Sequence, residues 1–418
     1  MTDLYYRRET CRLCGSPNVE LAVPLRPIPI ATPNFRVPDA DRESPVFREA
    51  VPLELHLCAD CGLLQVLHVG NPELQYGNYV YRTSLSLGLP EHFREYARGV
   101  IKTHRPPAGS LVLEFGSNDG TLLRAFKGEG MRVVGIDPAR DIARKATEAG
   151  IETVNAFFAA EVAGRIRESH GAARLIIANN VIANIDELDP VAEGVRAVMA
   201  PDGAFLFETQ YGLDVIEKML LDTVYHEHLS YFYVKPLVSF FACHRMQVID
   251  VEPISTKGGS IRVTVQHAGG PRLVAGRVAA AVAEEERRGM YDLARYRRFT
   301  AGIEALRAKL NGLADEQEAA GQLICGYGMS VGTTTLLAQF WLAGRIACLF
   351  DDDPDKERVL SGPGYDIPLY GPKAVLEKNP GAIVVFAWRY AESIMAKQGA
   401  YRARGGKFIV PLPEITVH

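Results

Sequence analysis

The chain has 418 residues, of which 47% are hydrophobic and 23% are charged, a composition typical of folded globular proteins. At about 150 residues per domain, this length predicts about three domains. The 46 basic and 50 acidic residues leave a net charge of -4, which argues against a nonspecific nucleic-acid-binding protein. No stretch approaches ~18 uninterrupted apolar residues, so we expect no membrane span. The first residues lack the apolar segment of a secretory signal, so we expect a cytoplasmic protein.

Two Cys-x-x-Cys pairs lie near the start of the chain, Cys11 with Cys14 and Cys58 with Cys61. Two such pairs can supply four thiolates to one tetrahedral Zn²⁺, and a four-cysteine site has no open position for catalysis. The alternative is a redox pair, which no helix start after either pair supports. We therefore predict that residues 1–75 form a small domain held together by a structural zinc ion.

Short apolar runs alternate with longer amphipathic segments from residue 76 to residue 270. Four of the runs predict buried strands, at 111–115, 131–137, 174–180 and 204–209. Segments such as 121–129 and 139–149 are typical of helices, and strands separated by helices form parallel sheets. The sequence therefore predicts an α/β core, with the segments up to residue 270 adding to its sheet.

The last third of the chain contains two segments of different composition. Residues 271–320 are rich in Ala, Glu and Arg, which predicts long helices with solvated charged faces. Residues 321–418 repeat the alternation of strands and helices, with apolar runs such as LICGYG and AIVVFA. We expect a helical connection followed by a second, Rossmann-like α/β domain.

A glycine-containing loop, Glu114-Phe-Gly-Ser-Asn-Asp-Gly120, follows the first predicted strand of the core. Glycines let the backbone pass close to a ligand and turn sharply into a helix. The next strand ends in Asp137, where nucleoside-binding sheets place an acid that accepts both ribose hydroxyls. The alternative is an ordinary turn followed by an unrelated acidic residue.

This combination resembles motifs I and II of class I S-adenosylmethionine-dependent methyltransferases. In such enzymes the loop after the third predicted strand faces the methyl sulfonium, and an oriented carbonyl there could stabilise the cation. The resemblance implies these cofactor-binding residues: Glu114, Gly116, Ser117, Asn118, Gly120, Asp137, Asn179 and Asn180.

A more specific motif is Tyr225-His-Glu-His-Leu-Ser-Tyr-Phe232. Together with the glycine loop and the cysteine pairs, it closely resembles the sugar C-methyltransferase family. The resemblance covers nearly the whole chain and implies a zinc-binding domain, a class I methyltransferase core and a C-terminal Rossmann-like domain. In that family the substrate is a nucleotide-linked 4-keto-deoxysugar, and the methyl group of S-adenosylmethionine goes to C3.

The chemistry implied by this family needs a base, because a carbon bound to hydrogen is not a nucleophile. A neighbouring ketone makes that proton acidic enough for removal, and the resulting enolate attacks the methyl group in line. His228 is a candidate base, Tyr225 could bind the enolate or relay the proton, and Glu227 could orient a histidine. Tyr81 begins another stretch shared with the family and is a fourth candidate. Without the family, the YHEH cluster is equally typical of a polar surface.

The sequence departs from the family at three positions expected near the substrate. Asn184 stands where many members have His, Leu85 where they have Tyr, and Lys257 where they have His in HGGSxR. Asn cannot act as a base, so an alternative is methylation of a sugar oxygen or nitrogen, or of a non-sugar ketone. Lys257 could pair with an anionic substrate group, or it is a solvated loop lysine. Arg262 closes the same motif.

The C-terminal domain opens with Gly326-Tyr-Gly328, and Gly332 replaces a lysine of the family. A glycine-rich turn at a helix start can hold phosphate, so the resemblance implies that Tyr327 and Gly328 bind the substrate nucleotide. Trp388 follows a predicted strand and could stack on its base. A different class, a zinc-containing binding protein for nucleic acid or protein, is disfavoured by the near-neutral charge.

Overall fold

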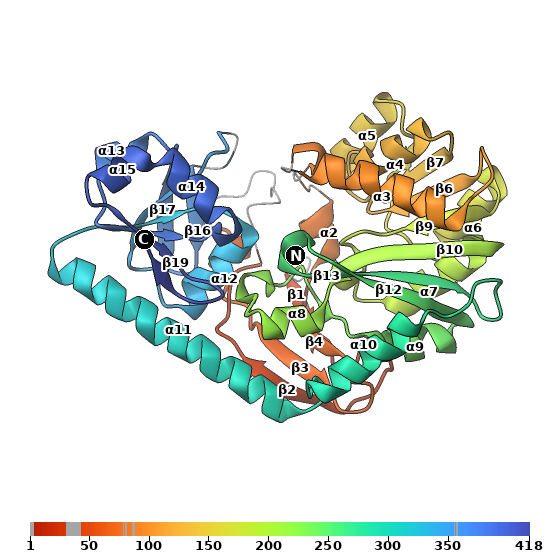
Figure 1. Cartoon of the computed structure of the whole chain (residues 1–418), viewed down its shortest axis with the longest axis horizontal. Helices are drawn as coiled ribbons and strands as arrows, with labels where there is room; N and C mark the ends of the chain where they lie inside the picture. Colours follow the sequence, from red (N-terminus) through yellow and green to blue (C-terminus); the bar gives the residue numbers. More distant parts are fainter. Residues whose placement is uncertain are drawn as a thin grey trace.

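The computed structural model describes residues 4–30, 43–77, 79, 82–85, 88–354, 356 and 358–418. We describe it in the four segments that the sequence predicts. The N-terminal segment lies between two larger α/β parts, and the helices α10 and α11 run along its lower side (Figure 1). No helix among these residues is long and apolar enough to cross a bilayer.

The N-terminal segment is built on an antiparallel sheet of four short strands in the order β11-β4-β3-β2. Their bounds are β2 Val19–Pro24, β3 Glu54–Cys58, β4 Leu64–Val66 and β11 Ser230–Tyr231. A second ladder pairs β1 (Tyr5–Arg7) with β5 (His68–Gly70), and two short helices are α1 (Pro45–Arg48) and α2 (Pro72–Tyr76). The strand β11 comes from the methyltransferase-like core, so this sheet is completed by a segment more than 150 residues further along the chain.

The core contains a seven-stranded sheet in the order β12-β13-β10-β9-β6-β7-β8. The bounds are β6 Leu111–Phe115, β7 Arg132–Ile136, β8 Thr153–Val154, β9 Ala173–Ile177, β10 Met199–Gln210, β12 Met246–Ile254 and β13 Ser260–His267. Strands β6 to β10 are parallel, and β13 runs antiparallel between β10 and β12. The four runs predicted as strands are β6, β7, β9 and β10, and the segments up to residue 270 do extend the sheet.

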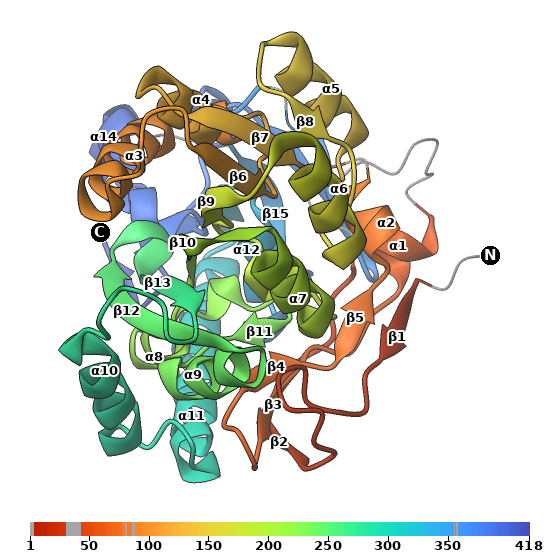
Figure 2. The ribbon, with the colours of Figure 1, turned by 90° about the vertical axis from the view of Figure 1, so that its right-hand side faces the viewer.

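Helices cover both faces of the core sheet (Figure 2). The bounds are α3 Leu89–His104, α4 Thr121–Gly128, α5 Arg140–Glu148, α6 Ala160–His170, α7 Leu188–Val198, α8 Gly212–Glu217 and α9 Val234–Cys243. Helices α3 and α4 pack their apolar residues on one face, and α6 and α7 pack on the other. Four single turns of 3-10 helix lie in the connections: η1 Thr83–Leu85, η2 Ile182–Asn184, η3 Leu221–Thr223 and η4 Thr256–Gly258.

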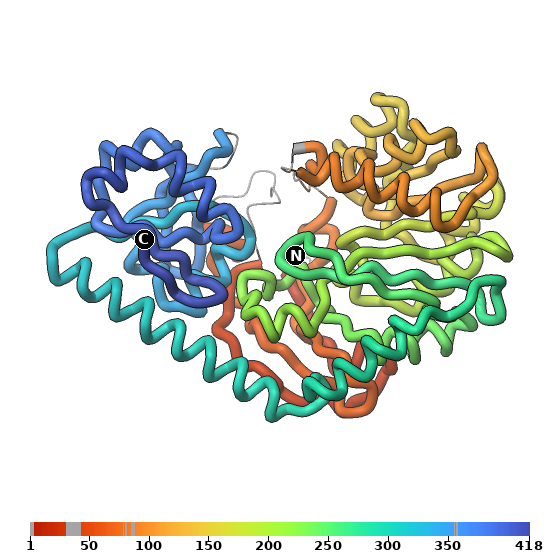
Figure 3. Tube along the Cα trace, in the orientation of Figure 1, coloured from red at the N-terminus to blue at the C-terminus, as the bar shows by residue number. Residues whose placement is uncertain are grey.

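The predicted helical connection consists of α10 (Gly276–Arg287) and the long helix α11 (Leu293–Ala319), which runs beneath β2 to the last domain (Figure 3). The C-terminal sheet has the order β16-β17-β15-β14-β18-β19-β20. Its strands are β14 Ile324–Tyr327, β15 Ile346–Phe350, β16 Val359–Gly362, β17 Tyr365–Tyr370, β18 Ala382–Val385, β19 Lys407–Val410 and β20 Thr416–Val417. Its helices are α12 Val331–Gln339, α13 Ala374–Lys378, η5 Trp388–Tyr390, α14 Ala391–Lys397 and α15 Gly399–Ala403.

One continuous apolar cluster joins all of these parts. It contains Leu57 and Leu64 of the N-terminal sheet, Phe205 of the core sheet, Phe299 of α11 and Leu336 of α12. Burial of apolar surface on this scale resists separation of the segments. The segment after η3, which contains Tyr225 to His228, therefore lies at a junction of three packed units rather than on an independent domain.

Candidate functional site

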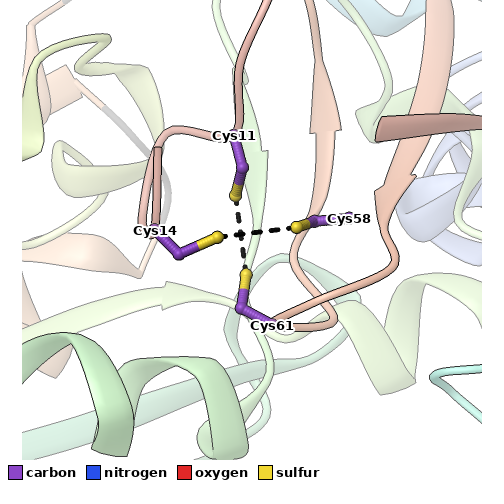
Figure 4. Close-up of side chains that lie close together, drawn as sticks. All are labelled: Cys11, Cys14, Cys58 and Cys61. Atoms are coloured by element: carbon purple, nitrogen blue, oxygen red, sulfur yellow. Dashed lines mark hydrogen bonds between the residues drawn. The ribbon is translucent and has the colours of Figure 1, made fainter. Parts of the chain in front are cut away.

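The four N-terminal cysteines converge at one point (Figure 4). All four sulfur atoms lie within 4.8 Å of one another, with 3.5 Å between Cys11 and Cys61 and 3.6 Å between Cys14 and Cys58. Four thiolates around a tetrahedral Zn²⁺ at about 2.3 Å would lie about 3.8 Å apart, so the arrangement fits zinc. Each pair closes a tight turn in which a glycine amide, Gly15 or Gly62, donates to the carbonyl of the first cysteine.

The electrostatics of the cluster also call for a cation. Burial and the charge of Cys11 raise the pKa of the Cys14 thiol to about 12, and the hydrogen bond to Cys11 and burial raise that of Cys61 further. Thiolates this close together repel one another, and a divalent ion would compensate their charge. The predicted structural Zn²⁺ site is thus formed by Cys11, Cys14, Cys58 and Cys61.

The glycine loop of the core follows β6 and is anchored to the end of β7. Gly116 has φ 66° and Gly120 has φ 73°, in the left-handed region that favours glycine. Asp137 accepts hydrogen bonds from the amide of Asn118 at 2.8 Å and from that of Ala139 at 2.9 Å. The carboxylate that was expected to hold a ribose therefore also fixes the shape of the loop.

Several buried polar atoms around this loop have no partner among the described residues: Glu114 Oε2, Ser117 Oγ and Asn179 Nδ2. Buried polar atoms are nearly always hydrogen-bonded, so this set fits a polar ligand such as S-adenosylmethionine. Burial raises the pKa of Asp137 to about 6, and burial together with Asp137 and Asp119 raises that of Glu114 well above its usual value.

The loop after β9 carries the predicted pair Asn179 and Asn180. Asn179 Oδ1 accepts from the amide of Glu208 at 2.9 Å, and the Asn180 amide donates to the Glu208 carbonyl at 2.7 Å. Asn180 has φ 57°, which turns the chain toward η2. The carbonyl of Ala183 in η2 then accepts from the amide of Leu229 at 2.7 Å, so the cofactor side of the core directly contacts the YHEH segment.

Tyr225 and His228 form a hydrogen-bonded pair. His228 Nδ1 lies 2.8 Å from the Thr223 carbonyl, which can only accept, so Nδ1 carries the ring proton. The other nitrogen, Nε2, then accepts from the Tyr225 hydroxyl at 3.1 Å. Burial lowers the pKa of His228 to about 3 and raises that of Tyr225 well above 10, so both groups are neutral at rest.

Glu227 lies beside this pair and is contacted by two tyrosines that the sequence analysis did not single out. The Tyr79 hydroxyl donates to Glu227 Oε2 at 3.2 Å, and the Tyr76 hydroxyl lies 3.5 Å from the Glu227 carbonyl. The available signal was the aromatic segment Tyr76-Gly-Asn-Tyr79-Val-Tyr81, from which only Tyr81 was chosen. Tyr81 lies outside the described residues.

His226 has a different environment from its neighbours in the motif. It is buried, and its Nε2 lies 3.1 Å from the carbonyl of Pro52 in the N-terminal segment. Burial lowers the pKa of His226 to about 4, so the neutral ring donates to that carbonyl. His226 therefore connects the YHEH segment to the N-terminal segment and does not join the Tyr225 and His228 pair.

The two cations of the KGGSIR motif have different environments. Lys257 is solvent-exposed, and its ammonium makes no hydrogen bond or ion pair within the described part of the chain. Although the residue as a whole is exposed, desolvation of its ammonium by the surrounding protein lowers the pKa of Lys257 to about 8, against the opposing charges of Glu227 and Glu208. Arg262 donates to Glu208 at 2.6 Å and to Glu252 at 3.3 Å, so its charge is already paired.

The three C-terminal residues that were predicted to bind substrate differ in how far their polar groups are already hydrogen-bonded within the protein. Tyr327 is buried and its hydroxyl donates to Asp352 at 2.7 Å, while Gly328 packs against Ala387. Trp388 is half-buried, and its Nε1 is a buried donor that lacks a partner within the described ranges. Of these residues, Trp388 has the free donor that a ligand would satisfy.

Trp388 is followed by an arginine that bridges the last domain to the core. Arg389 donates two hydrogen bonds to Asp222, at 2.6 Å and 3.2 Å. Asp222 lies just before the YHEH segment, and Gly332 of α12 packs so closely against its carbonyl that a side chain would collide with it. The contact leaves no room for a side chain at this position, and glycine supplies no cation for a substrate phosphate.

Three family models match consecutive parts of the chain. A family whose description names a zinc binding domain matches residues 11–76, a methyltransferase domain family matches residues 91–241, and a C-methyltransferase C-terminal domain family matches residues 255–413. These matches confirm the class I methyltransferase core and the S-adenosylmethionine and zinc cofactors that the sequence predicted.

Known proteins extend the similarity to the full length. The C-methyltransferase NovU of Streptomyces niveus is 33% identical over 414 residues, which cover 99% of this chain and 98% of NovU. Solved structures are remote, and they include the PH0226 protein of Pyrococcus horikoshii OT3 (16% identity, TM-score 0.37, covering 47% of this chain and 96% of that one). The magnesium protoporphyrin IX methyltransferase of Synechocystis PCC 6803 is similarly remote (13% identity, TM-score 0.33, covering 43% and 83%). The chain therefore belongs to the C-methyltransferase family that includes NovU, and it is an S-adenosylmethionine-dependent methyltransferase.

Proposed function

We propose that this enzyme methylates C3 of a nucleotide-linked 4-keto-deoxysugar. The observation that carries the proposal is the neutral Tyr225 and His228 pair, in which the histidine offers an unprotonated nitrogen to the tyrosine hydroxyl. Methylation at carbon requires such a group, because the C3 proton must leave before the carbon can attack. Methylation at oxygen or nitrogen would not require removal of a proton from carbon.

The geometry supports a relay. The Tyr225 oxygen takes the C3 proton while its own proton passes to His228 Nε2, so the tyrosine ends the step neutral and the imidazole becomes cationic. The resting imidazole of His228 is neutral, with its one proton on Nδ1, which leaves Nε2 able to accept another. Glu227 lies close enough to raise the pKa of Tyr225, and its negative charge would stabilise the imidazolium that forms.

The remaining residues would bind and orient the reactants. S-adenosylmethionine, when bound, supplies an electrophilic methyl group on sulfur. Asp137, Glu114, Ser117 and Asn179 would hold it through the polar atoms described above. Lys257 would offer its unpaired charge to an anionic group of the substrate, and the Trp388 indole would donate to the nucleotide.

A mass-spectrometric assay with S-adenosylmethionine and a panel of dTDP-, GDP- and CDP-linked 4-ketosugars tests this function. We expect a mass gain of one methyl group with at least one of them, and exchange of the C3 proton with solvent deuterium. Tyr225→Phe and His228→Ala should lower kcat about 10²-fold to 10⁴-fold without changing S-adenosylhomocysteine affinity. Methylation without C3 exchange would instead favour an oxygen or nitrogen acceptor, which the amide of Asn184 in place of a base would suit.

A further inference from the structure

A single arginine connects the zinc-binding turn to the catalytic segment. Arg12 lies between the zinc ligands Cys11 and Cys14 and is 2% exposed. Its Nε donates to Asp186 at 2.7 Å, Nη1 donates to the Leu229 carbonyl at 2.9 Å, and Nη2 donates to the Val66 carbonyl at 2.7 Å. A planar guanidinium can meet three acceptors in fixed directions at once.

These three acceptors belong to three different units. Asp186 follows η2 in the loop that begins with Asn179 and Asn180, and Leu229 directly follows His228. Val66 is the last residue of β4, the strand that pairs with β11. The side chain therefore touches the cofactor side of the core, the catalytic motif and the N-terminal sheet together.

The backbone of Leu229 is held at both its carbonyl and its amide. Its carbonyl accepts from Arg12 and from the Val66 amide, each at 2.9 Å, and its amide donates to the Ala183 carbonyl at 2.7 Å. His228 precedes this peptide, and the turn from Tyr225 to His228 is closed by a single backbone hydrogen bond of 3.0 Å. The position of the His228 ring thus depends on the peptide that Arg12 holds.

We propose that Arg12 is a positioning residue for proton transfer, holding the Tyr225 and His228 pair against the loop that faces the cofactor. The proposal rests on the proposed function, since it assigns that pair a role in proton transfer. Rates respond steeply to such placement, and a displacement of about 1 Å can lower a rate about 10²-fold. The zinc-binding turn then serves catalysis through the geometry of its buried arginine.

Arg8 provides a matched control. It also comes from the N-terminal segment and also forms an ion pair with Asp186, at 3.0 Å, together with one to Glu187 at 2.7 Å. Its side chain makes no hydrogen bond to Leu229 or Val66 in the described structure, and its Nε donates to the nearby Thr10 carbonyl. Loss of either arginine removes an ion pair to the same carboxylate, but only loss of Arg12 removes a hydrogen bond from the Leu229 carbonyl, which the Val66 amide then holds alone.

The experiment compares Arg12→Gln, Arg12→Lys and Arg8→Gln in the full-length zinc-loaded enzyme. Hydrogen–deuterium exchange of peptides covering residues 224–231 reports the placement of the motif without any sugar. Zinc content and S-adenosylhomocysteine affinity report the two cofactor sites. Methyl transfer to the 4-ketosugar on which the unmodified enzyme is active gives kcat and KM.

For Arg12→Gln we expect faster exchange at 224–231, a kcat lower by about 10²-fold, and zinc content, KM and S-adenosylhomocysteine affinity unchanged. Arg12→Lys keeps a charge for Asp186 but cannot reach both carbonyls, so it should show a smaller change of the same kind. Arg8→Gln should leave exchange at 224–231 and kcat unchanged.

Equal effects of Arg12→Gln and Arg8→Gln, or unchanged exchange at 224–231 in Arg12→Gln, would overturn the proposal. If Arg12→Gln loses its zinc, the test rests on Arg12→Lys. This variant must then retain zinc and show faster exchange at residues 224–231 for the proposal to stand. If no ketosugar is methylated, the proposed function fails, while exchange and cofactor affinity still show whether Arg12 places the motif.

Discussion

The core and the C-terminal domain contain the same backbone arrangement at the same place in their sheets. In the core, Gly116 donates its amide to the Ile136 carbonyl at 2.8 Å, and Asp137 accepts from the amides of Asn118 and Ala139. The C-terminal domain repeats this with Gly328 donating to Phe350 at 2.8 Å. There Asp351 accepts from Met329 at 2.7 Å and from Asp353 at 3.0 Å.

The two loops differ in how their polar groups are satisfied. Lys356 donates to both Asp351 and the Met329 carbonyl, each at 2.7 Å, so the second loop is closed by its own lysine. Within the described residues, Asp137 has no such cation. The buried Glu114 of the first loop corresponds in position to Gly326, against which Leu349 and Phe386 pack. Around the first loop, buried polar atoms have no partner among the described residues, whereas in the second loop a lysine of the protein binds the aspartate.

The largest difference in cofactor affinity should be between Asp137→Ala and the matched variant Asp351→Ala. Asp137→Ala should weaken S-adenosylhomocysteine binding about 100-fold, because it removes a charged acceptor and releases the Asn118 amide. Asp351→Ala should leave that affinity unchanged. Calorimetric titration of both variants measures the difference, and equal weakening would show that the two loops are not functionally distinct.

The pH dependence of cofactor binding sharpens the same contrast. Burial raises the pKa of Asp137 from 3.8 to about 6, so its ionised form is lost as the pH falls through 6. We expect S-adenosylhomocysteine affinity to fall about tenfold for each pH unit below that value. Titrations between pH 5 and 8 test this, with Asp137→Asn as a control that should give a weak but flat profile.

The unpaired Lys257 and the paired Lys218 should differ in their effect on kcat/KM. The pKa of Lys257 is lowered to about 8, so its cation is lost as the pH rises through 8 and kcat/KM should fall above that pH. Lys257→Met should lower kcat/KM about tenfold at pH 7 and abolish this alkaline limb. Lys218→Met removes an exposed lysine near the same loop and should keep the limb. If the fall in kcat/KM above pH 8 persists in Lys257→Met, the titration of this lysine is not its cause.

The smallest effect should follow loss of the lysine that closes the second loop. Lys356→Met should lower the free energy of unfolding by about 1 kcal/mol, because Asp351 loses a partly buried partner. Lys397→Met, which breaks the more exposed pair with Asp352, should change it very little. Thermal unfolding measures both, and an increase in cofactor affinity in Lys356→Met would mean that the second loop competes for the same ligand.

The strand ends of both α/β parts could be predicted from the sequence, because continuous apolar runs such as 111–115 end in glycine or acidic residues. The zinc ligands were equally readable, since their spacing alone defines the site. The hairpin of β16 and β17 was not predicted, because its apolar residues alternate only weakly on either side of Gly362-Pro-Gly364.

The site itself was only partly readable. The pattern indicated Tyr225, Glu227 and His228, but not the tautomer of His228, which depends on the Thr223 carbonyl. Tyr79 was not predicted, because an aromatic segment does not show which of its rings contacts Glu227, and Tyr81 stays a prediction. Long-range pairs such as Arg12 with Leu229 depend on how separate units pack, and no local pattern encodes them.

The strand β11 has a consequence for how the protein can be made and rearranged. Ser230 and Tyr231 supply the edge of a sheet whose other strands end at residue 66. During synthesis on the ribosome, the first segment leaves the exit tunnel long before these residues. Its four-stranded sheet therefore lacks the edge strand β11 until they emerge. A chimaera that exchanges residues 1–75 between relatives would for the same reason need to carry the YHEH segment with it.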